Sequence, residues 1–169
     1  RMSTSWVRFG TFEYFYAKKR FDKLEALADY VIEESYPHLR GMEDAYFLMF
    51  EELVDRTALL LAKWQGVGFN RGVMNTDNVS IAGETIDYGP CAFMDEFRHD
   101  KVFSSIDRFG RYAYSNQAPI AQWNLARLAE CLLFISDERE RFEEIVYGFL
   151  DAYEARYIEL MRRKLGFST

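Results

Sequence analysis

The most informative part of the chain lies near its middle, where it reads Arg71-Gly72-Val73-Met74-Asn75-Thr76-Asp77-Asn78-Val79-Ser80-Ile81. After Ala82-Gly83-Glu84 it continues Thr85-Ile86-Asp87-Tyr88-Gly89. The β-branched residues at 79–81 and 85–86, with a glycine between them, predict a tight β-hairpin. The strands of a hairpin lie side by side, so residues at its open end meet. Asn78 and Asp87 occupy that open end, and we expect their side-chain oxygens to converge.

Such a pair of oxygens predicts a metal site. Mg²⁺ prefers oxygen ligands, and nucleotide enzymes supply one or two of them from side chains and leave the rest to phosphate and water. We therefore expect Asn78 and Asp87 to bind Mg²⁺, or Mn²⁺ in its place. The alternative is that residues 75–78 only form a turn with side-chain-to-backbone hydrogen bonds, as these residue types often do. The spacing to Asp-Tyr-Gly favours the metal site.

The same segment resembles the catalytic segment of kinase-type phosphotransferases. There a catalytic Asp is followed by a metal-binding Asn and, after a short hairpin, by the metal-binding Asp of an Asp-Phe-Gly triplet. When the segments are aligned on Gly72 and Asn78, the catalytic Asp falls at position 73, which is Val73 here. The metal pair is present and the usual base is missing. Asp77 is the carboxylate that stands closest to the gap in sequence.

A more specific resemblance extends over nearly the whole chain. The chain is similar to the SelO family, called YdiU in bacteria, whose members resemble kinases but act as protein adenylyltransferases. The residues that carry the resemblance are Val7–Glu13, Trp64–Phe69, Gly72–Asn78, Ile86–Pro90, Phe93–Asp95, Gly110–Tyr112, Trp123–Leu125 and Leu160–Gly166. Two positions depart from the family, because Arg71 and Trp6 stand where we expect His.

The resemblance implies transfer of AMP from ATP to Ser, Thr or Tyr hydroxyls of other proteins. It implies that the nucleotide is flipped relative to a kinase and presents its α-phosphorus to the acceptor. Asp77 would then accept the proton of the hydroxyl, while Asn78 and Asp87 bind the metal.

Arg1 and Arg8 match two arginines of the family's nucleotide site. Their spacing of seven would put both guanidinium groups on one face if the segment were helical, and the donor fork of arginine suits phosphate oxygens. The alternative is a pair of solvated surface arginines.

The length of 169 residues indicates a single domain, residues 1–169, with a sizeable core because 49% of the residues are hydrophobic. The sequence contains no Gly-rich phosphate loop and no strand lysine of the Val-Ala-Ile-Lys type. We expect the C-terminal lobe of a protein-kinase-like fold without its N-terminal lobe. Such a fragment would be inactive alone and would bind ATP weakly or not at all.

The composition argues against several classes of partner and site. The net charge of −6 argues against nucleic acid, and no stretch is long enough to cross a bilayer. Two cysteines and two distant histidines support neither a disulfide framework nor a zinc site. The resemblance places the protein in the cytoplasm if it is bacterial and in mitochondria if it is eukaryotic.

Hydrophobic periodicity predicts a mainly α (α+β) fold with one short catalytic-loop hairpin. Helices are expected over Phe21–Glu34 before Pro37, over Glu43–Trp64 directly before the motif, from Pro119 onward, and over 142–165 as one helix or two, with Gly166 as the cap. Residues 89–117 are expected to form a loop. Its aromatic residues either anchor it to the core, the interpretation we favour, or line a groove for an acceptor protein.

Two other functions fit the sequence. One is a kinase of the aminoglycoside-phosphotransferase type that uses Asp77 as a displaced base. The other is a non-catalytic pseudokinase module that binds partners through residues 89–117.

Overall fold

The structure is a computed structural model that describes residues 2–167. Its α-helices are α1 (Phe9–Ala17), α2 (Phe21–Ser35), α3 (Ala45–Gly66), α4 (Gln117–Leu132) and α5 (Arg139–Lys164). Three single 3₁₀ turns are η1 (Pro37–Leu39), η2 (Thr76–Asn78) and η3 (Tyr114–Asn116). Within the described residues the only sheet has two short strands, β1 (Phe69–Asn70) and β2 (Ala92–Phe93). The prediction of a mainly α fold is confirmed.

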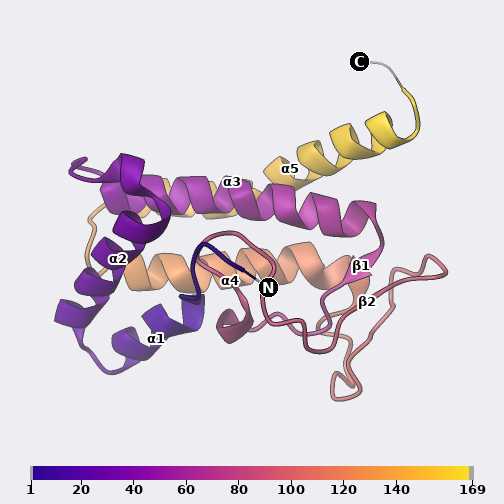
Figure 1. Ribbon diagram of the computed structural model, residues 1–169, viewed down its shortest axis with the longest axis horizontal. Coiled ribbons are helices and arrows are strands. Elements are labelled where there is room, and N and C mark those ends of the chain that lie inside the picture. Colours follow the sequence, from indigo (N-terminus) through magenta and orange to yellow (C-terminus); the bar gives the residue numbers. More distant parts are fainter. Residues whose placement is uncertain (1, 168–169) are drawn as a thin grey trace.

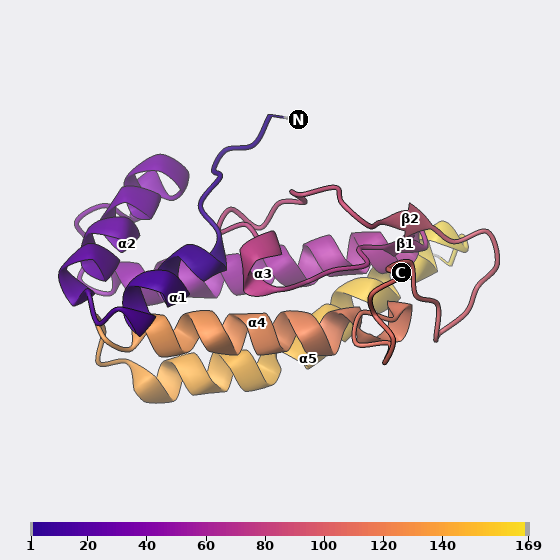
Figure 2. The same cartoon turned by 90° about the horizontal axis from the view of Figure 1, so that it is seen from below.

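The three long helices α3, α4 and α5 form the body of the molecule (Figure 1). Helix α5 packs against α3 and α4, while α1 packs against α4 and α2 at one end of the bundle (Figure 2). Helix α3 is apolar over much of its circumference, so it lies at the centre with Phe50, Leu53 and Leu61 fully buried. None of the helices among residues 2–167 is long and apolar enough to span a bilayer.

Periodicity placed α2, α3, α4 and α5 well, whereas α1 was not predicted. Helix α2 ends at Ser35, just before Pro37, and Pro119 lies in the first turn of α4, which begins two residues earlier at Gln117. Helix α5 is a single helix rather than two. It ends at Lys164 and is followed by Gly166, which has a φ of +76°, while the Phe167 amide donates to the Arg162 carbonyl at 3.0 Å. This left-handed glycine cap satisfies carbonyls of the last turn.

The predicted hairpin over 79–81 and 85–86 is wrong. Ser80 instead forms an antiparallel bridge with Arg8, and the amide of Ile81 donates to the carbonyl of Val7 at 3.0 Å. The amide of Phe9 donates to the carbonyl of Val79 at 3.1 Å. Residues 79–81 therefore pair with the segment before α1, which leaves residues 85–86 without the strand partner that the hairpin required.

The strand pair that does form, β1–β2, brings together the two ends of residues 71–91, which contain the motif. In the antiparallel pair β1–β2, Phe69 lies opposite Phe93 and Asn70 lies opposite Ala92. Residues 71–91 thus leave and return at the same point, beside the end of α3. This loop carries Asp77, Asn78 and Asp87.

The aromatic residues of segment 89–117 divide into two groups. Tyr112 and Tyr114 are buried, and Tyr114 donates a hydrogen bond of 2.5 Å to the Gln65 carbonyl, so these two anchor the loop. Phe97 and Phe109 are exposed.

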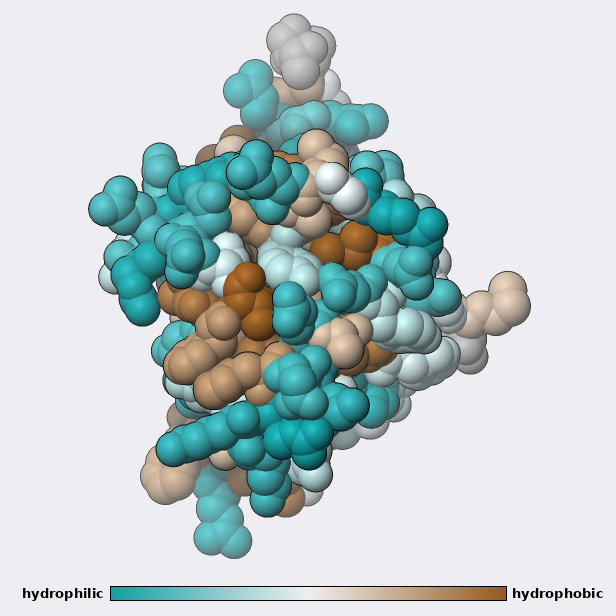
Figure 3. All heavy atoms as spheres, turned by 90° about the vertical axis from the view of Figure 1, so that its left-hand side faces the viewer, coloured by the Kyte–Doolittle hydropathy of each residue, from teal (hydrophilic) through white to brown (hydrophobic). Residues whose placement is uncertain are grey.

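A second aromatic group lies at the opposite end of the molecule. Phe21 stacks on Phe134 with ring centroids 4.8 Å apart, and Tyr16 meets Phe134 edge-on. Figure 3 shows this end, where hydrophobic side chains gather among hydrophilic ones.

Candidate active site

Buried polar residues of α4 hold the first half of the loop in place. Gln117 accepts a hydrogen bond of 2.8 Å from the Arg71 amide and donates one of 3.0 Å to the Phe69 carbonyl. Two turns further along, Asn124 donates to the Met74 carbonyl at 2.8 Å. Both side chains are fully buried. Because buried backbone groups need partners, these bonds fix the path of residues 69–74.

The turn that carries Asp77 is held by α1. Glu13 accepts a hydrogen bond from the hydroxyl of Thr76, and its other carboxylate oxygen accepts one of 3.2 Å from Nε of Arg127. On the other side, Tyr112 donates to the side chain of Asn75. Turn η2 is therefore fastened to α1, to α4 and to the loop after β2.

Asp77 itself is exposed and lies against the start of α1. A Cβ atom added at Gly10 would overlap the carboxylate of Asp77. The absence of a side chain at Gly10 is what lets this carboxylate approach the helix so closely. Asp77 thus combines a fixed backbone with a side chain that reaches solvent.

Asn78 follows directly and is half-buried. Its amide donates to the Asn75 carbonyl at 2.8 Å, so the turn considered as the alternative interpretation of residues 75–78 is present, and a backbone hydrogen bond closes it. Asn78 also lines a cavity of about 30 Å³ together with Arg71 and Ile86. A volume of this size accommodates a single water molecule.

Asp87 has an unusual backbone and an arginine partner. Its φ of +51° lies in the left-handed region, which Asp tolerates better than most residues. Its Oδ1 accepts a hydrogen bond of 2.9 Å from Nη2 of Arg8. Nε of Arg8 is buried and has no hydrogen-bond partner among residues 2–167.

Arg71, at a position where we expected His, is buried to 2% exposure. It donates a hydrogen bond of 2.7 Å from Nη2 to the Ile86 carbonyl. Burial lowers the pKa of its guanidinium, and the nearby Cys91, Asp87 and Tyr88 act in the opposite direction. The side chain therefore links the first half of the loop to the second.

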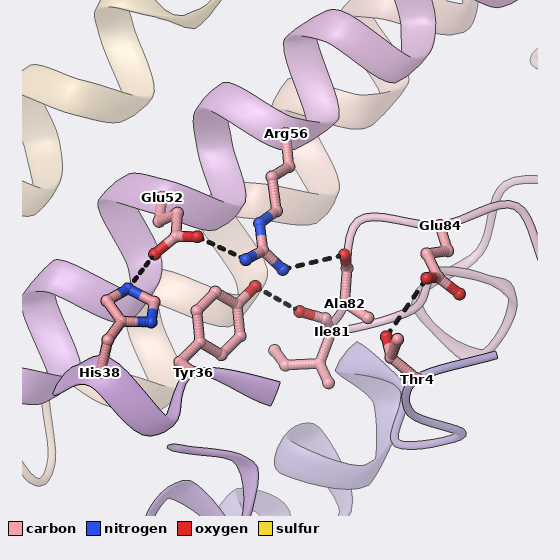
Figure 4. Close-up of polar contacts among 8 residues, drawn as sticks. All are labelled: Thr4, Tyr36, His38, Glu52, Arg56, Ile81, Ala82 and Glu84. Carbon is pink, nitrogen blue, oxygen red and sulfur yellow. Dashed lines mark hydrogen bonds and ion pairs between the residues drawn. The ribbon is translucent and has the colours of Figure 1, made fainter. Parts of the chain in front are cut away.

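The middle of the loop is held by Arg56 of α3 and by Tyr36, the residue that follows α2 (Figure 4). Tyr36 donates to the Ile81 carbonyl at 2.8 Å, and Arg56 donates to the Ala82 carbonyl at 3.5 Å. Arg56 is in turn paired with Glu52, which also contacts His38 at 2.8 Å. Burial strongly raises the pKa of Tyr36, which keeps its hydroxyl protonated as a donor.

The donor set fits a metal that is shared with a nucleotide. No group of three or more His, Cys, Asp or Glu side chains among residues 2–167 could enclose a metal alone. Mg²⁺ in nucleotide sites takes only one or two protein oxygens, which Asn78 and Asp87 offer. The unpartnered Nε of Arg8 beside Asp87 is a donor for an anionic oxygen of the kind a phosphate carries. The convergence of Asn78 and Asp87 stays a prediction, since the hairpin on which it rested does not form.

Of the two arginines predicted to bind the nucleotide, the structure describes only one. Arg1 lies outside the described residues. Arg8 stands just before α1 with an extended backbone at φ −114° and ψ 158°, and no helix covers residues 2–8. The idea of one shared helical face is therefore wrong, although Arg8 does reach the loop through Asp87.

Comparison with known families supplies the context for this geometry. The family described as protein adenylyltransferase SelO matches residues 1–169, which is the whole chain. The chain belongs to the SelO family. Among curated relatives, the protein nucleotidyltransferase YdiU of Agrobacterium fabrum is 48% identical over 100% of this chain. The proteins of the same name from Bradyrhizobium sp. and Rhodopseudomonas palustris are each 49% identical over 100% of it.

The chain spans about a third of the length of these relatives, at 36% of the first and 35% of the other two. The residues that carry the SelO resemblance lie mainly in the loop between β1 and β2 and at the start of α1, with further segments at the end of α3, around β2, before η3, in the middle of α4 and at the end of α5. The sequence did not reveal that Glu13, Gln117 and Asn124 anchor this loop. Glu13 and Asn124 stand within segments that carry the family resemblance, but those segments indicate no partner for them.

Proposed function

We propose that the SelO protein of which this chain is part transfers AMP from ATP to hydroxyl groups of Ser, Thr or Tyr in other proteins. The observation that carries the proposal is the match of the whole chain to this family together with Val73 at the position of the kinase base. Kinases of the usual type carry their catalytic Asp at that position, and the apolar side chain of Val73 cannot accept a proton.

In this reaction the acceptor oxygen forms a bond to the α-phosphorus of ATP. The bond from the α-phosphorus to the oxygen that bridges to the β-phosphorus breaks, and pyrophosphate leaves. The hydroxyl proton passes to the Asp77 carboxylate. The support for Asp77 is its fixed turn, held through Thr76 and Glu13, and its exposed side chain. A positioned base of this kind contributes about 10²–10⁴-fold to the rate.

The remaining residues act on the phosphates. Asn78 and Asp87 are the residues that would hold Mg²⁺, which when bound supplies positive charge to the departing pyrophosphate. Arg8 holds the Asp87 carboxylate in one orientation through Nη2 and offers its unpartnered Nε to a phosphate oxygen. The surrounding fold is in our proposal the C-terminal lobe of a kinase-like enzyme, because a long buried helix directly precedes the motif loop.

Labelled ATP tests the proposal with the whole protein and a mixture of acceptor proteins. AMP transfer puts label from the α-phosphate on protein and none from the γ-phosphate, and Asp77→Asn reduces that label at least about 100-fold. Label from the γ-phosphate would instead identify a kinase. If neither label is transferred with Mg²⁺ present, the remaining interpretation is the non-catalytic binding module. Glu130→Gln, an exposed change on α4, is the matched control.

We further propose that residues 1–169 alone bind ATP weakly, because the sequence offers no Gly-rich loop and no strand lysine to hold the phosphates. Calorimetric titration of the chain with ATP and Mg²⁺ measures this. A dissociation constant in the low micromolar range would contradict it.

A further inference from the structure

The feature that the proposed chemistry leaves unexplained is the buried side chain of Arg71. It comes first among the largest fully buried side chains of the described residues. A buried guanidinium is costly unless its charge is paired or its donors are bonded. The ion pairs found among residues 2–167 do not include Arg71, and its recorded side-chain bond runs to a backbone carbonyl. A charge placed here must therefore do something that an apolar residue of the same size would not do.

The carbonyl that Arg71 contacts belongs to Ile86, which immediately precedes Asp87. The bond from Nη2 is 2.7 Å long and fully buried. Asp87 has a left-handed backbone with φ +51°, a conformation that surrounding contacts must hold. A hydrogen bond from a charged donor to the preceding peptide is one such contact, and it is stronger than a neutral one.

Gly72, the neighbour of Arg71, lies against the chain on the other side of Asp87. Gly72 has a φ of +71°, and a Cβ atom added there would overlap the Pro90 carbonyl. The two consecutive residues Arg71 and Gly72 thus touch the chain just before and just after the Asp87-Tyr88-Gly89 triplet. Within the triplet, the Gly89 amide bonds to the Asp87 carbonyl at 2.7 Å.

The other end of Arg71 is itself fixed. Its amide donates to Gln117 of α4 at 2.8 Å, so the residue is anchored to the helical body. Arg71 also lines the same cavity as Asn78 and Ile86. One residue therefore connects α4, through its backbone amide, with the Asp87 side of the loop, through its guanidinium, and it shares a cavity with Asn78.

From this geometry we propose that Arg71 is a positioning residue, which orients Asp87 toward the metal site by bonding the Ile86 carbonyl. This inference rests on the function proposed above for Asp87. It predicts that loss of the guanidinium loosens residues 86–90 and weakens metal binding while the helices stay folded.

The first measurement is hydrogen–deuterium exchange on the whole protein without nucleotide, comparing Arg71→Met with the parent. Met has a similar length and no donor. We expect exchange at residues 86–90 to rise at least about tenfold, the factor that loss of one hydrogen bond to a buried carbonyl gives, with unchanged exchange in α2. The matched control is Arg98→Met, which changes an exposed arginine paired with Asp100 in the following loop and leaves residues 86–90 unaffected. Unchanged exchange at 86–90 in folded Arg71→Met overturns the proposal.

The second measurement is binding of Mn²⁺ in the presence of a non-hydrolysable ATP analogue, followed by electron paramagnetic resonance. The dissociation constant for Mn²⁺ should rise about tenfold in Arg71→Met and by a smaller factor in Arg71→Lys, which keeps one flexible donor. A purely structural role would lower the melting temperature and leave this constant unchanged, and that result also overturns the proposal.

Arg71→Lys serves if Arg71→Met does not fold. Parental behaviour of Arg71→Lys in both measurements then counts against the proposal, because an ammonium does not reproduce the fixed donor fork of arginine. Neither measurement requires AMP transfer. A protein that transfers no AMP but shows both effects would remove the proposed function and keep the positioning role.

Discussion

Arg8 and Asp87 lie 79 residues apart in the chain, yet Nη2 of Arg8 donates a hydrogen bond of 2.9 Å to Oδ1 of Asp87. The two residues were predicted to serve different partners, one a phosphate and the other a metal ion. In the structure each also holds the other. This pair ties the segment before α1 to the end of the motif loop, so both parts of the proposed nucleotide site depend on one contact.

Replacing Arg8 should therefore affect nucleotide binding more than folding. The side chains are 36% and 29% exposed, and partly exposed ion pairs contribute about 0.2–1 kcal/mol to stability. We expect Arg8→Met to lower the free energy of unfolding by no more than about 1 kcal/mol. The Michaelis constant of the whole protein for ATP should rise about tenfold or more, with a smaller rise for Arg8→Lys.

Steady-state kinetics and urea unfolding measure the two effects. Arg40→Met is the control, because it removes an exposed ion pair with Glu33. Equal effects of both variants on the Michaelis constant would show that Arg8 has no particular role.

Glu13 offers a second test, since it holds the turn that carries Asp77 and has no part in the proposed phosphate contacts. Glu13→Gln weakens the charged bonds to Thr76 and Arg127, and should reduce stability by about 1–2 kcal/mol. Because Asp77 acts on the acceptor in the proposed reaction, the turnover number should fall while the Michaelis constant for ATP changes little.

The matched control for this variant is Glu130→Gln. Glu130 contacts the same Arg127 at 2.6 Å but stands on α4, and Thr76 is bonded to Glu13 instead. A fall in turnover of the same size in both variants would assign the effect to Arg127 rather than to the turn.

These contacts also show why the sequence predicts some features and misses others. Helices α2, α3 and α5 follow from apolar residues that recur every three to four positions, which is a local pattern. The strand partner of residues 79–81 lies at residues 7–9, and no local pattern distinguishes it from the nearer stretch at 85–86. The hairpin prediction failed for that reason.

The candidate site divides in the same way. Asp77, Asn78 and Asp87 stand in a continuous motif with characteristic spacing, so they could be selected from the sequence. Gln117 and Asn124 hold the same loop across 46 and 50 residues, and nothing in their neighbourhood indicates a partner. The burial of Arg71 was equally hidden, because arginines are mostly exposed.

The buried thiol of Cys131 should make the free energy of unfolding depend on pH in the alkaline range. Burial raises the pKa of its thiol from 9.0 to about 12. Between these values the unfolded chain loses the thiol proton and the folded chain keeps it, so the free energy of unfolding falls as pH rises. The contribution is fully present below pH 9 and is lost by at most about 1.4 kcal/mol per pH unit above it.

Urea unfolding between pH 7 and pH 11 compares the parent with Cys131→Ala. The variant should be less stable at pH 7, because it leaves a small cavity in α4, but its stability should fall less steeply above pH 9. Parallel curves for the two proteins across the whole range would contradict the prediction.

Replacing Gly10 tests the position of the Asp77 side chain separately from the stability of the fold. An alanine at this position of α1 would be favourable for the helix by about 0.5–1 kcal/mol, but its Cβ would displace the Asp77 carboxylate. We expect Gly10→Ala to keep the melting temperature within a few degrees of the parent and to lower AMP transfer by the whole protein at least about tenfold. The matched control for this variant is Gly148→Ala on α5, where an added Cβ has no atom within 4 Å. This control should raise the stability by about 0.5–1 kcal/mol and leave the transfer rate unchanged. Full activity of Gly10→Ala would mean that the position of Asp77 beside α1 is not the one used in catalysis.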